Sequence, residues 1–229
     1  MKIAVMQPYF FPYIGYWQLI NIVDIFVIYD DVSFIKGGYI NRNSLLNKSN
    51  AQLITLELFG ASSNKKINDI NLGDNRNKLL KTIKQNYSKA PFYNNILPLI
   101  EEIINNNEKK LHKFLAFSLI EVSKYLNIKT NFIYSSEIKN NKSLNAQDRL
   151  IEISKILNAT EFINPIGGIE LYDREVFSKN MINLSFLKTS KISYNQFNDN
   201  FVSNLSIIDV LMFNDKEQIK SILEMNKLI

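Results

Sequence analysis

The 229-residue chain contains no cysteine and one histidine, His112. Without cysteine there can be no disulfide bond, thiolate metal site or thiol nucleophile. One histidine cannot build a multi-histidine metal centre, and a histidine-based catalytic triad would have to use His112 alone. Because His112 lies in a lysine-rich stretch, residues 109–113, we expect it to be a solvated or partly packed surface residue without a chemical role. We therefore predict no metal-binding residues, and the sequence leaves the cofactor open.

The chain also has no apolar run of the roughly 18 residues that a membrane span needs. Its N-terminal apolar stretch is interrupted by Pro8 and Pro12, which is not typical of a signal peptide. We therefore expect a cytoplasmic protein with no membrane span.

The excess of positive charge is small and dispersed. The 27 Lys and Arg residues exceed the 22 Asp and Glu residues by five, and no block of like charges occurs. Such a pattern does not favour nucleic-acid binding, although a mildly positive surface would suit an anionic ligand. Arginine is scarce, at positions 42, 76, 149 and 174, so each retained arginine hints at a need for a planar, two-pronged donor.

The apolar pattern at the start of the chain predicts a strand, a helix and a second strand. Residues 2–6 form a short apolar run, a helical spacing begins at Tyr13, and residues 24–29 form another apolar run. Such a unit is normally parallel and right-handed. With 46% hydrophobic residues, the chain can bury one core, and we expect a single domain over residues 1–229.

The remaining pattern places further strands late in the chain and helices in the middle. We therefore predict an α/β fold with a Rossmann-like parallel-sheet core and a helical insertion at residues 75–127. Residues 41–47 read as a loop or short helix, and residues 207–228 as one or two closing helices. The predicted elements are helices at 75–87, 92–106, 108–126, 145–157 and 174–179, and strands at 51–59, 130–134, 161–164 and 182–187.

The first candidate site follows the first strand. In a parallel α/β sheet, ligands bind outside the carboxyl ends of the strands, and a helix N-terminus there favours an anion. We expect Phe10, Phe11 and Trp17 to be core residues. The residues expected to contact a substrate are Gln7, Tyr9, Tyr13, Gly15 and Tyr16.

Asp30 and Asp31 end the second predicted strand. Because neighbouring side chains of a strand point to opposite sides, we expect at most one of them to face the site. That one would be a general base, a ribose acceptor or a Mg²⁺ ligand. A turn or capping role for one of the two is an equal alternative.

Two glycine pairs accompany further candidates. Lys36, the pair Gly37–Gly38 and the triplet Asn41, Arg42 and Asn43 have a composition that suits an anion or a sugar, or else form a surface loop. Gly167 and Gly168 follow a late strand and would add a loop to the same rim. We expect all these groups to open onto one hollow.

Residues over nearly the whole chain carry a family resemblance. The opening MQPYFFPYIGYWQLI, followed by VDIFVIYDDVSFIKGGYINRN, resembles the WbqC-like family of bacterial proteins. The likeness continues in the strings YSKAPF, DRL, GGIELYD and NLSIID and in Ser135–Ser136. The resemblance implies a role in making O-antigen or another surface polysaccharide, through acyl or aminoacyl transfer to an activated amino sugar.

A second, shorter resemblance concerns the turn into the first helix. The string Tyr13-Ile14-Gly15-Tyr16 is similar to the His-x-Gly-His turn of nucleotidylyltransferases and adenylate-forming amide ligases, in which both histidines bind phosphates. Both positions are tyrosine here, which argues against adenylyl transfer. The string Lys188-Thr189-Ser190-Lys191 is similar to the second signature of that superfamily, but strings this short are common by chance.

Three hypotheses follow. In the first, the protein is a transferase or ligase acting on a nucleotide-activated sugar. Tyr9 or Tyr13 would hold the ligand, Arg42 and Lys36 an anionic group, and Asp30 or Asp31 would act as base, with catalysis assigned to Asp30, Asp31 and Tyr13. In the second, it is a non-catalytic module that binds a nucleotide or nucleotide sugar and recruits enzymes. A nucleic-acid-binding protein is the third and is disfavoured by the dispersed charge. The partner is thus a small-molecule nucleotide sugar or acyl donor, and a homodimer stays open.

Overall fold

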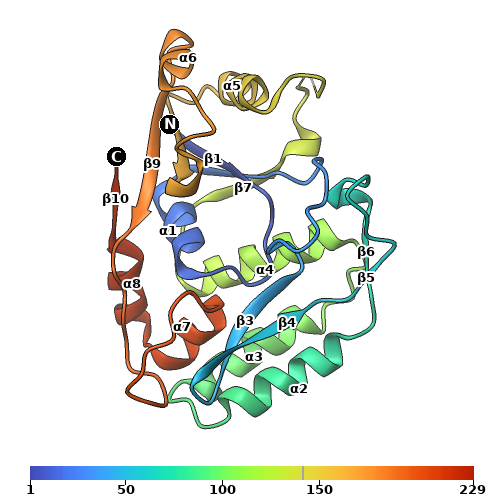
Figure 1. The fold of residues 1–229 in the computed structure, drawn as a ribbon, viewed down its shortest axis with the longest axis vertical. Coiled ribbons are helices and arrows are strands. Elements are labelled where there is room, and N and C mark those ends of the chain that lie inside the picture. The colour runs from blue at the N-terminus through green and yellow to red at the C-terminus, as the bar shows by residue number, and fades with distance from the viewer. Residues whose placement is uncertain (141) are drawn as a thin grey trace.

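The computed structural model describes residues 1–140 and 142–229, and a mostly parallel sheet of six strands forms its centre (Figure 1). The strand order is β10-β9-β8-β1-β2-β7, with β10 antiparallel to β9 and every other pair parallel. The strands are β1 (Lys2–Met6), β2 (Ile25–Ile28), β7 (Asn131–Tyr134), β8 (Glu161–Pro165), β9 (Asn183–Thr189) and β10 (Asn226–Leu228).

The order of the parallel strands places a reversal next to β1. From β1 the chain moves outward through β2 to β7, then returns to the other side of β1 with β8 and continues to β9. The carboxyl ends of β1 and β8 therefore lie side by side where the direction of winding changes, which is where open α/β sheets form a ligand crevice. The predicted α/β class with a parallel sheet is confirmed.

Both faces of the sheet are covered because side chains alternate along each strand. In β1, Ile3 and Val5 point into an apolar cluster with α5 and α6, whereas Ala4 points into a larger cluster with α1 and α4. Figure 1 shows these helix pairs on opposite sides of the sheet. Their bounds are α1 (Ile14–Ile22), α4 (Leu111–Tyr125), α5 (Ala146–Ile156) and α6 (Arg174–Lys179).

A long connection between β2 and β7 holds two small hairpins and three helices. Its helices lie within the predicted range 75–127, and their apolar faces belong to the cluster that covers α1. The predictions of one domain and of a separate helical insertion stay predictions. The elements of this connection are β3 (Arg42–Asn47), β4 (Asn50–Thr55), β5 (Leu58–Phe59), β6 (Asn71–Leu72), α2 (Arg76–Tyr87), α3 (Tyr93–Ile104) and α4.

Two local predictions are wrong. The loop or short helix expected at residues 41–47 is strand β3, which pairs along its whole length with β4. Residues 226–228, expected to end a helix, form β10 and pair with β9. In both places pairing with another strand overrides a local pattern of weak strand preference, since residues 41–47 include three asparagines and residues 226–228 include an asparagine and a lysine.

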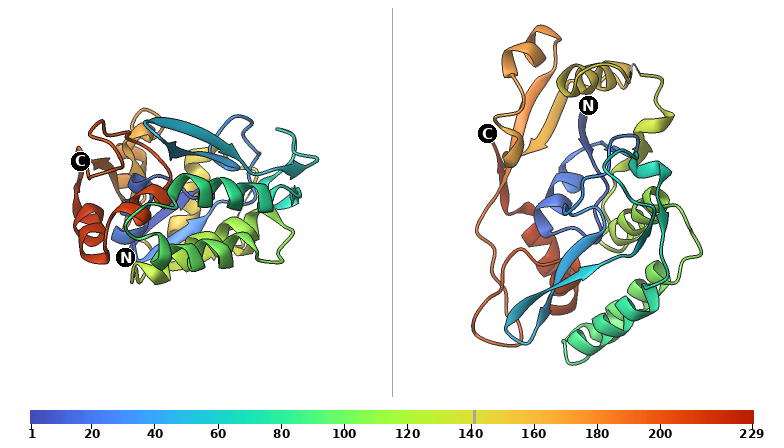
Figure 2. Two further views of the ribbon diagram at one scale, coloured as in Figure 1. Left: turned by 90° about the horizontal axis from the view of Figure 1, so that it is seen from below. Right: turned by 45° about the vertical axis from the view of Figure 1, so that its right-hand side comes forward.

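The C-terminal part begins with an extended segment, residues 190–206, which we call the strap. It has no helix or strand and leads from β9 to α7 (Ile207–Phe213), followed by α8 (Lys216–Glu224). In Figures 1 and 2 its loop lies beside the tip of the β3–β4 hairpin. Among the described helices, none is long and apolar enough to cross a membrane.

Candidate functional site

Several predicted residues follow the carboxyl ends of the parallel strands. Gln7 follows β1, Asp30 and Asp31 come shortly after β2, and Gly167 and Gly168 come after β8. All these residues therefore lie along one edge of the sheet, as the sequence predicts. Their side chains do not open onto one hollow, however, and the structure divides them into separate groups.

The proline-rich turn between β1 and α1 is fixed by side chains from later in the chain. Phe11 has a φ of 42°, a left-handed conformation that is strained for a bulky residue. The Asn43 amide donates to the carbonyls of Phe10 and Phe11 at 3.1 and 2.7 Å, and the Ser206 hydroxyl donates to Phe11 at 2.9 Å. Asn43 thus holds the turn in place while also lining a hollow beside it.

Tyr16 supports the same turn from beneath. It is 1% exposed, and its hydroxyl donates to the backbone carbonyl of Gln7 at 2.8 Å. Burial raises the pKa of its phenol, so Tyr16 stays neutral. Its ring lies 5.3 Å from the ring of Tyr9, centroid to centroid. The predicted substrate contact of Tyr16 is untested, and the observed contacts make it a support for Tyr9.

The main candidate site is a hollow of about 370 Å³, which we call the aromatic hollow. Three tyrosine rings, from Tyr9, Tyr13 and Tyr39, share its wall with Pro12, Asn43 and Asn204. The three tyrosine hydroxyls make no hydrogen bond with the described residues, so they are free to meet a ligand. Burial raises the pKa of Tyr9 and Tyr13, which keeps both phenols protonated donors. The volume lies within the range typical of small-molecule sites.

Gly15 brings the aromatic hollow up against the end of β9. A Cβ atom at Gly15 would lie 2.5 Å from the Tyr13 ring and 2.7 Å from the hydroxyl of Thr189. Glycine at this position therefore leaves room for the Tyr13 ring, and the predicted substrate contact of Gly15 stays a prediction. Beyond it lies a smaller hollow of about 210 Å³ that shares Tyr13 and Asn204 and is bordered by the strap, including Lys191.

Lys36, Asn41 and Arg42 lie elsewhere. They line a separate, open hollow of about 320 Å³. The Arg42 guanidinium donates to the carbonyl of Gly38 at 3.0 Å, and the Asn41 amide donates to Leu56 at 2.9 Å. None of the three is among the residues that line the aromatic hollow. The expected common hollow is therefore wrong for this group, because the side chains of Asn41 and Arg42 bond to backbone carbonyls around their own loop.

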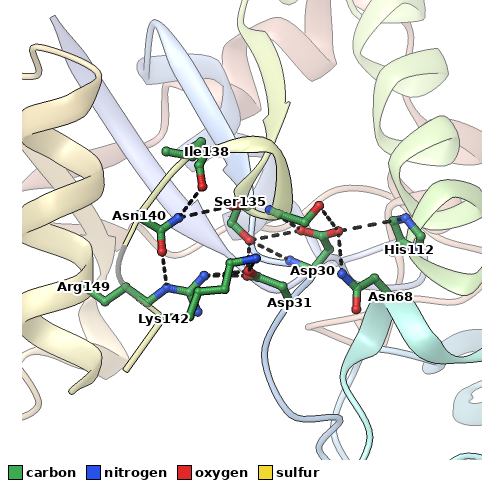
Figure 3. Close-up of polar contacts among 10 residues, drawn as sticks. Asp30, Asp31, Asn68, His112, Ser135, Ile138, Asn140, Lys142 and Arg149 are labelled. Carbon is green, nitrogen blue, oxygen red and sulfur yellow. Dashed lines mark hydrogen bonds and ion pairs between the residues drawn. The ribbon is translucent and has the colours of Figure 1, made fainter. Parts of the chain in front are cut away.

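Asp30 and Asp31 form a second group, the aspartate cluster, drawn in Figure 3. Asp30 is completely buried, and its carboxylate accepts hydrogen bonds from the Ser136 backbone at 3.0 Å, the Ser136 hydroxyl at 2.7 Å and the Asn68 amide at 3.4 Å. These donors hold its carboxylate beneath the end of β7. Asp30 is not among the residues that line the hollows described above.

Asp31 is 3% exposed and binds two cations. One guanidinium nitrogen of Arg149 lies 2.7 and 2.8 Å from its two oxygens, and Lys142 lies at 2.9 Å. Burial alone would raise the pKa of Asp31, but hydrogen bonds from Ser135, Lys142 and Arg149 outweigh it and lower the pKa to about 2. The carboxylate is thus ionised, and the scarce arginine at 149 binds both of its oxygens.

The two aspartates share one neighbour, but their other partners lie on opposite sides of the sheet: Arg149 of α5 binds Asp31, and His112 of α4 lies beside Asp30. The Ser135 hydroxyl lies 3.0 Å from an oxygen of Asp30 and 2.6 Å from one of Asp31. Apart from that shared contact, the two carboxylates diverge as expected for neighbouring residues of an extended segment. That one of them faces a ligand stays a prediction.

His112 belongs to the aspartate cluster, which sequence reasoning missed. It is 9% exposed, and its Nε2 lies 3.9 Å from Asp30. Its Nδ1 is buried and has no partner among the described residues, and burial lowers its pKa. The surface position expected from the surrounding lysines is wrong. The buried residues Ala116 and Leu119, four and seven positions later, were the signal that His112 lies on the inner face of α4.

Of the two glycines after β8, only Gly168 lies in a place too tight for a side chain. A Cβ atom at Gly168 would lie 1.9 Å from the amide nitrogen of Asn164, whereas Gly167 faces open space. Neither residue is among those that line the aromatic hollow. Across residues 1–140 and 142–229, no three His, Cys, Asp or Glu side chains gather as metal ligands would.

Comparison with known proteins finds similarity over nearly the whole chain. Residues 7–221 match the sequence model of the WbqC-like protein family. A Mycobacterium tuberculosis protein, named Uncharacterized protein Rv1507c, is 28% identical in an alignment of 220 positions that covers 92% of this chain and 92% of that protein. No solved structure shows significant similarity to this chain. Because the family match extends over almost all of the sequence, the chain belongs to the WbqC-like protein family.

Proposed function

We propose that this protein binds a nucleotide-activated sugar in the aromatic hollow and transfers an acyl or aminoacyl group to it, as a step in making a bacterial surface polysaccharide. The observation that carries the binding part is the hollow itself. Tyr9, Tyr13 and Tyr39 surround about 370 Å³ with three rings and three hydroxyls that no described residue uses. Aromatic faces stack on bases and sugars, and free hydroxyls supply the few polar contacts that orient a ligand.

The position of the hollow supports the same ligand class. Three of its lining residues, Tyr9, Pro12 and Tyr13, follow β1, which is one of the two strands between which the winding of the sheet reverses. The strand order β7-β2-β1-β8-β9 has the pattern of a Rossmann-like sheet, and nucleotides bind at that place in such sheets. The Rossmann-like assignment and a cytoplasmic location belong to this proposal.

The transfer part rests on the family resemblance and on one residue of the hollow. In acyl transfer to an amino sugar, the amine nitrogen forms a bond to the acyl carbonyl carbon. The bond to the leaving group breaks, and the amine proton passes to a base or to the leaving group. Tyr13 lines the hollow, and its raised pKa keeps it protonated. It would donate a hydrogen bond to the oxygen that becomes negative in the transition state.

A second function, a binding module without catalysis, is supported by the aspartate cluster. The carboxylates of Asp30 and Asp31 are engaged by protein donors and do not line the aromatic hollow. A general base must lie within hydrogen-bonding reach of the proton that it takes. If the hollow holds its ligand in the described conformation, neither aspartate is placed to be that base.

Calorimetric titration with a panel of nucleotide sugars tests the binding part. Tyr39→Ala removes an exposed ring from the hollow, and we expect binding to weaken about tenfold, the upper range for an aromatic contact. Phe59→Ala is the matched control, because Phe59 and Tyr39 are similarly exposed, at 55% and 58%, and Phe59 lies in another hollow. No binding of any nucleotide sugar, or equal loss in both variants, would refute the proposal.

Mass spectrometry of a bound amino-sugar nucleotide incubated with acyl thioesters separates the two functions. A mass gain of one acyl group in the wild type, reduced at least tenfold in Tyr13→Phe with ligand affinity kept, supports transfer. Binding without any mass change supports the binding module.

A further inference from the structure

A further hollow, of about 410 Å³, has lining residues that are all different from those of the hollows described above. It is formed between the turn of the β3–β4 hairpin, the end of α2 and the loop of the strap, which lie together in Figure 2. We call it the amide hollow, because four of its lining residues carry side-chain amides. Its lining residues are Asn47, Lys48, Gln85, Asn86, Ser88, Lys89, Phe197 and Asn198.

The strap residues of the amide hollow are held in place. The Asn198 amide donates to the carbonyl of Lys48 at 3.0 Å and to the Ser49 hydroxyl at 3.1 Å, which joins the strap to the hairpin turn. The Phe197 ring meets the Phe213 ring at 4.7 Å, edge to face, and stays 38% exposed. An aromatic ring is therefore fixed at the surface.

A buried carboxylate braces the same loop from behind. The Gln196 amide donates to Asp209 at 2.7 Å, and its carbonyl oxygen accepts from the Val202 backbone at 2.8 Å. Asp209 is completely buried and also accepts from the Tyr194 hydroxyl at 2.7 Å. The loop at residues 197–201 is thus closed at its base, and ordering it on binding would cost little entropy.

Polar groups around the ring are not used by the protein. Side chains of Asn47, Gln85 and Ser88 make no hydrogen bond with the described residues. The Asn86 amide nitrogen donates to Leu46 and Gln52, at 2.9 and 2.8 Å, which turns its carbonyl oxygen away from those partners. The hollow therefore offers donors and acceptors together, which sugar hydroxyls require because each hydroxyl is both.

The charge in the amide hollow has one sign. Lys48 and Lys89 line it, and neither forms an ion pair with any described residue. No aspartate or glutamate is among the lining residues. Two unpaired ammonium groups beside amides and an exposed ring favour a ligand that carries a negative charge as well as hydroxyls.

We propose that the amide hollow binds an acidic carbohydrate, with a sugar face against Phe197, hydroxyls on the amides and a carboxylate or phosphate between Lys48 and Lys89. This site goes beyond the function proposed above and stands whether or not the aromatic hollow binds a nucleotide sugar. The charge of the carbohydrate comes either from a uronate or from a phosphate ester, and separate probes distinguish them.

The test is NMR titration of the isotope-labelled full chain. The probes are a tetrasaccharide of alternating glucuronate and N-acetylglucosamine, glucose 6-phosphate, the neutral N-acetylglucosamine tetrasaccharide and inorganic phosphate. We expect the first or the second probe to shift amide signals of residues 47–48, 85–89 and 197–198. We expect the neutral saccharide and phosphate alone to bind at least tenfold more weakly. The neutral saccharide lacks the charge that meets the two lysines, and phosphate lacks the sugar that meets Phe197 and the amides.

Two variants test the amide hollow, and a third serves as the control. Phe197→Ala should weaken the acidic probe about tenfold, and Lys48→Gln together with Lys89→Gln should remove the preference for acidic over neutral saccharide. Phe59→Ala should change neither. Absence of shifts with both acidic probes at millimolar concentration, or phosphate binding as tightly as the acidic sugars, would overturn the proposal. Shifts confined to the aromatic hollow would also overturn it while leaving the proposed function intact.

Discussion

The aromatic hollow and the aspartate cluster lie at the same edge of one sheet, yet their polar groups are used in opposite ways. Each of the four carboxylate oxygens of Asp30 and Asp31 lies close to at least two protein partners. In the aromatic hollow, the hydroxyls of Tyr9, Tyr13 and Tyr39 have no partner among the described residues. A group whose hydrogen bonds are already made stabilises the fold, whereas a group with unmade bonds at a hollow is available to a ligand.

This comparison predicts that the two regions respond differently to mutation. Changes in the aspartate cluster should lower the free energy of unfolding and leave ligand affinity unchanged. Changes in the walls of the aromatic hollow should lower ligand affinity and leave the free energy of unfolding nearly unchanged. Residues that position the hollow should affect both quantities.

The largest effect is expected for Arg149→Met. It leaves the buried carboxylate of Asp31 with Lys142 as its only cation, and breaking a buried pair in this way costs about 3 to 5 kcal/mol. Urea unfolding measures the loss, and nucleotide-sugar affinity should not change. Lys84→Ala, which breaks the exposed pair with Glu101, is the control and should lower the free energy of unfolding far less, because solvent screens an exposed pair. Equal losses in both variants would contradict the structural role of the cluster.

Asn43→Ala should come next, at about 2 kcal/mol, because it removes the donor to two carbonyls of the strained turn. Unlike Arg149→Met, it should also weaken ligand binding, since the turn carries Tyr9 and Pro12 into the hollow. Unfolding and calorimetric titration of the same variant report the two effects. Ser206→Ala, which removes only one donor to Phe11, should show both effects more weakly. Loss of stability with unchanged affinity would show that the turn does not shape the site.

A pH dependence of similar size is expected for Asp31. Its pKa in the folded protein is lowered from 3.8 to about 2. A lowered folded-state pKa means that the ionised group stabilises the fold above pH ~4 and that this contribution is lost as the pH falls towards 2. Wild type should therefore lose roughly 2 kcal/mol more than Asp31→Asn between pH 5 and pH 2 in urea unfolding. Parallel pH profiles for the two proteins would show that Asp31 does not titrate in this way.

The smallest effect is expected for Tyr16→Phe. It removes one buried hydrogen bond to Gln7 and keeps the ring beneath Tyr9, which should cost about 1 kcal/mol of stability. Affinity for a nucleotide sugar should stay within twofold of wild type. A large loss of affinity with unchanged stability would instead place the Tyr16 hydroxyl on the ligand.

The sequence predicts the part of the fold that local patterns determine. The strand, helix and strand at residues 2–28 and the three middle helices follow from apolar spacing, and the edge that carries the candidate residues follows from parallel strands. The partners of that edge could not be predicted in the same way. Arg149 is 118 residues from Asp31, and Ser135 is 104 residues away, so no local pattern joins them. The expectation of one common hollow failed because it ignored partners that only the folded chain brings together.

The strap connects two of the hollows through one buried carboxylate. Tyr194 on one limb borders the hollow beside Tyr13, Phe197 on its loop borders the amide hollow, and Tyr194 and Gln196 are tied to the same carboxylate of Asp209. A ligand that displaced Tyr194 or the loop after Gln196 would disturb the hydrogen bonds at Asp209 that hold the other limb. Thermodynamic reciprocity then requires that each occupant alter the affinity for the second by an equal factor, whichever arrives first.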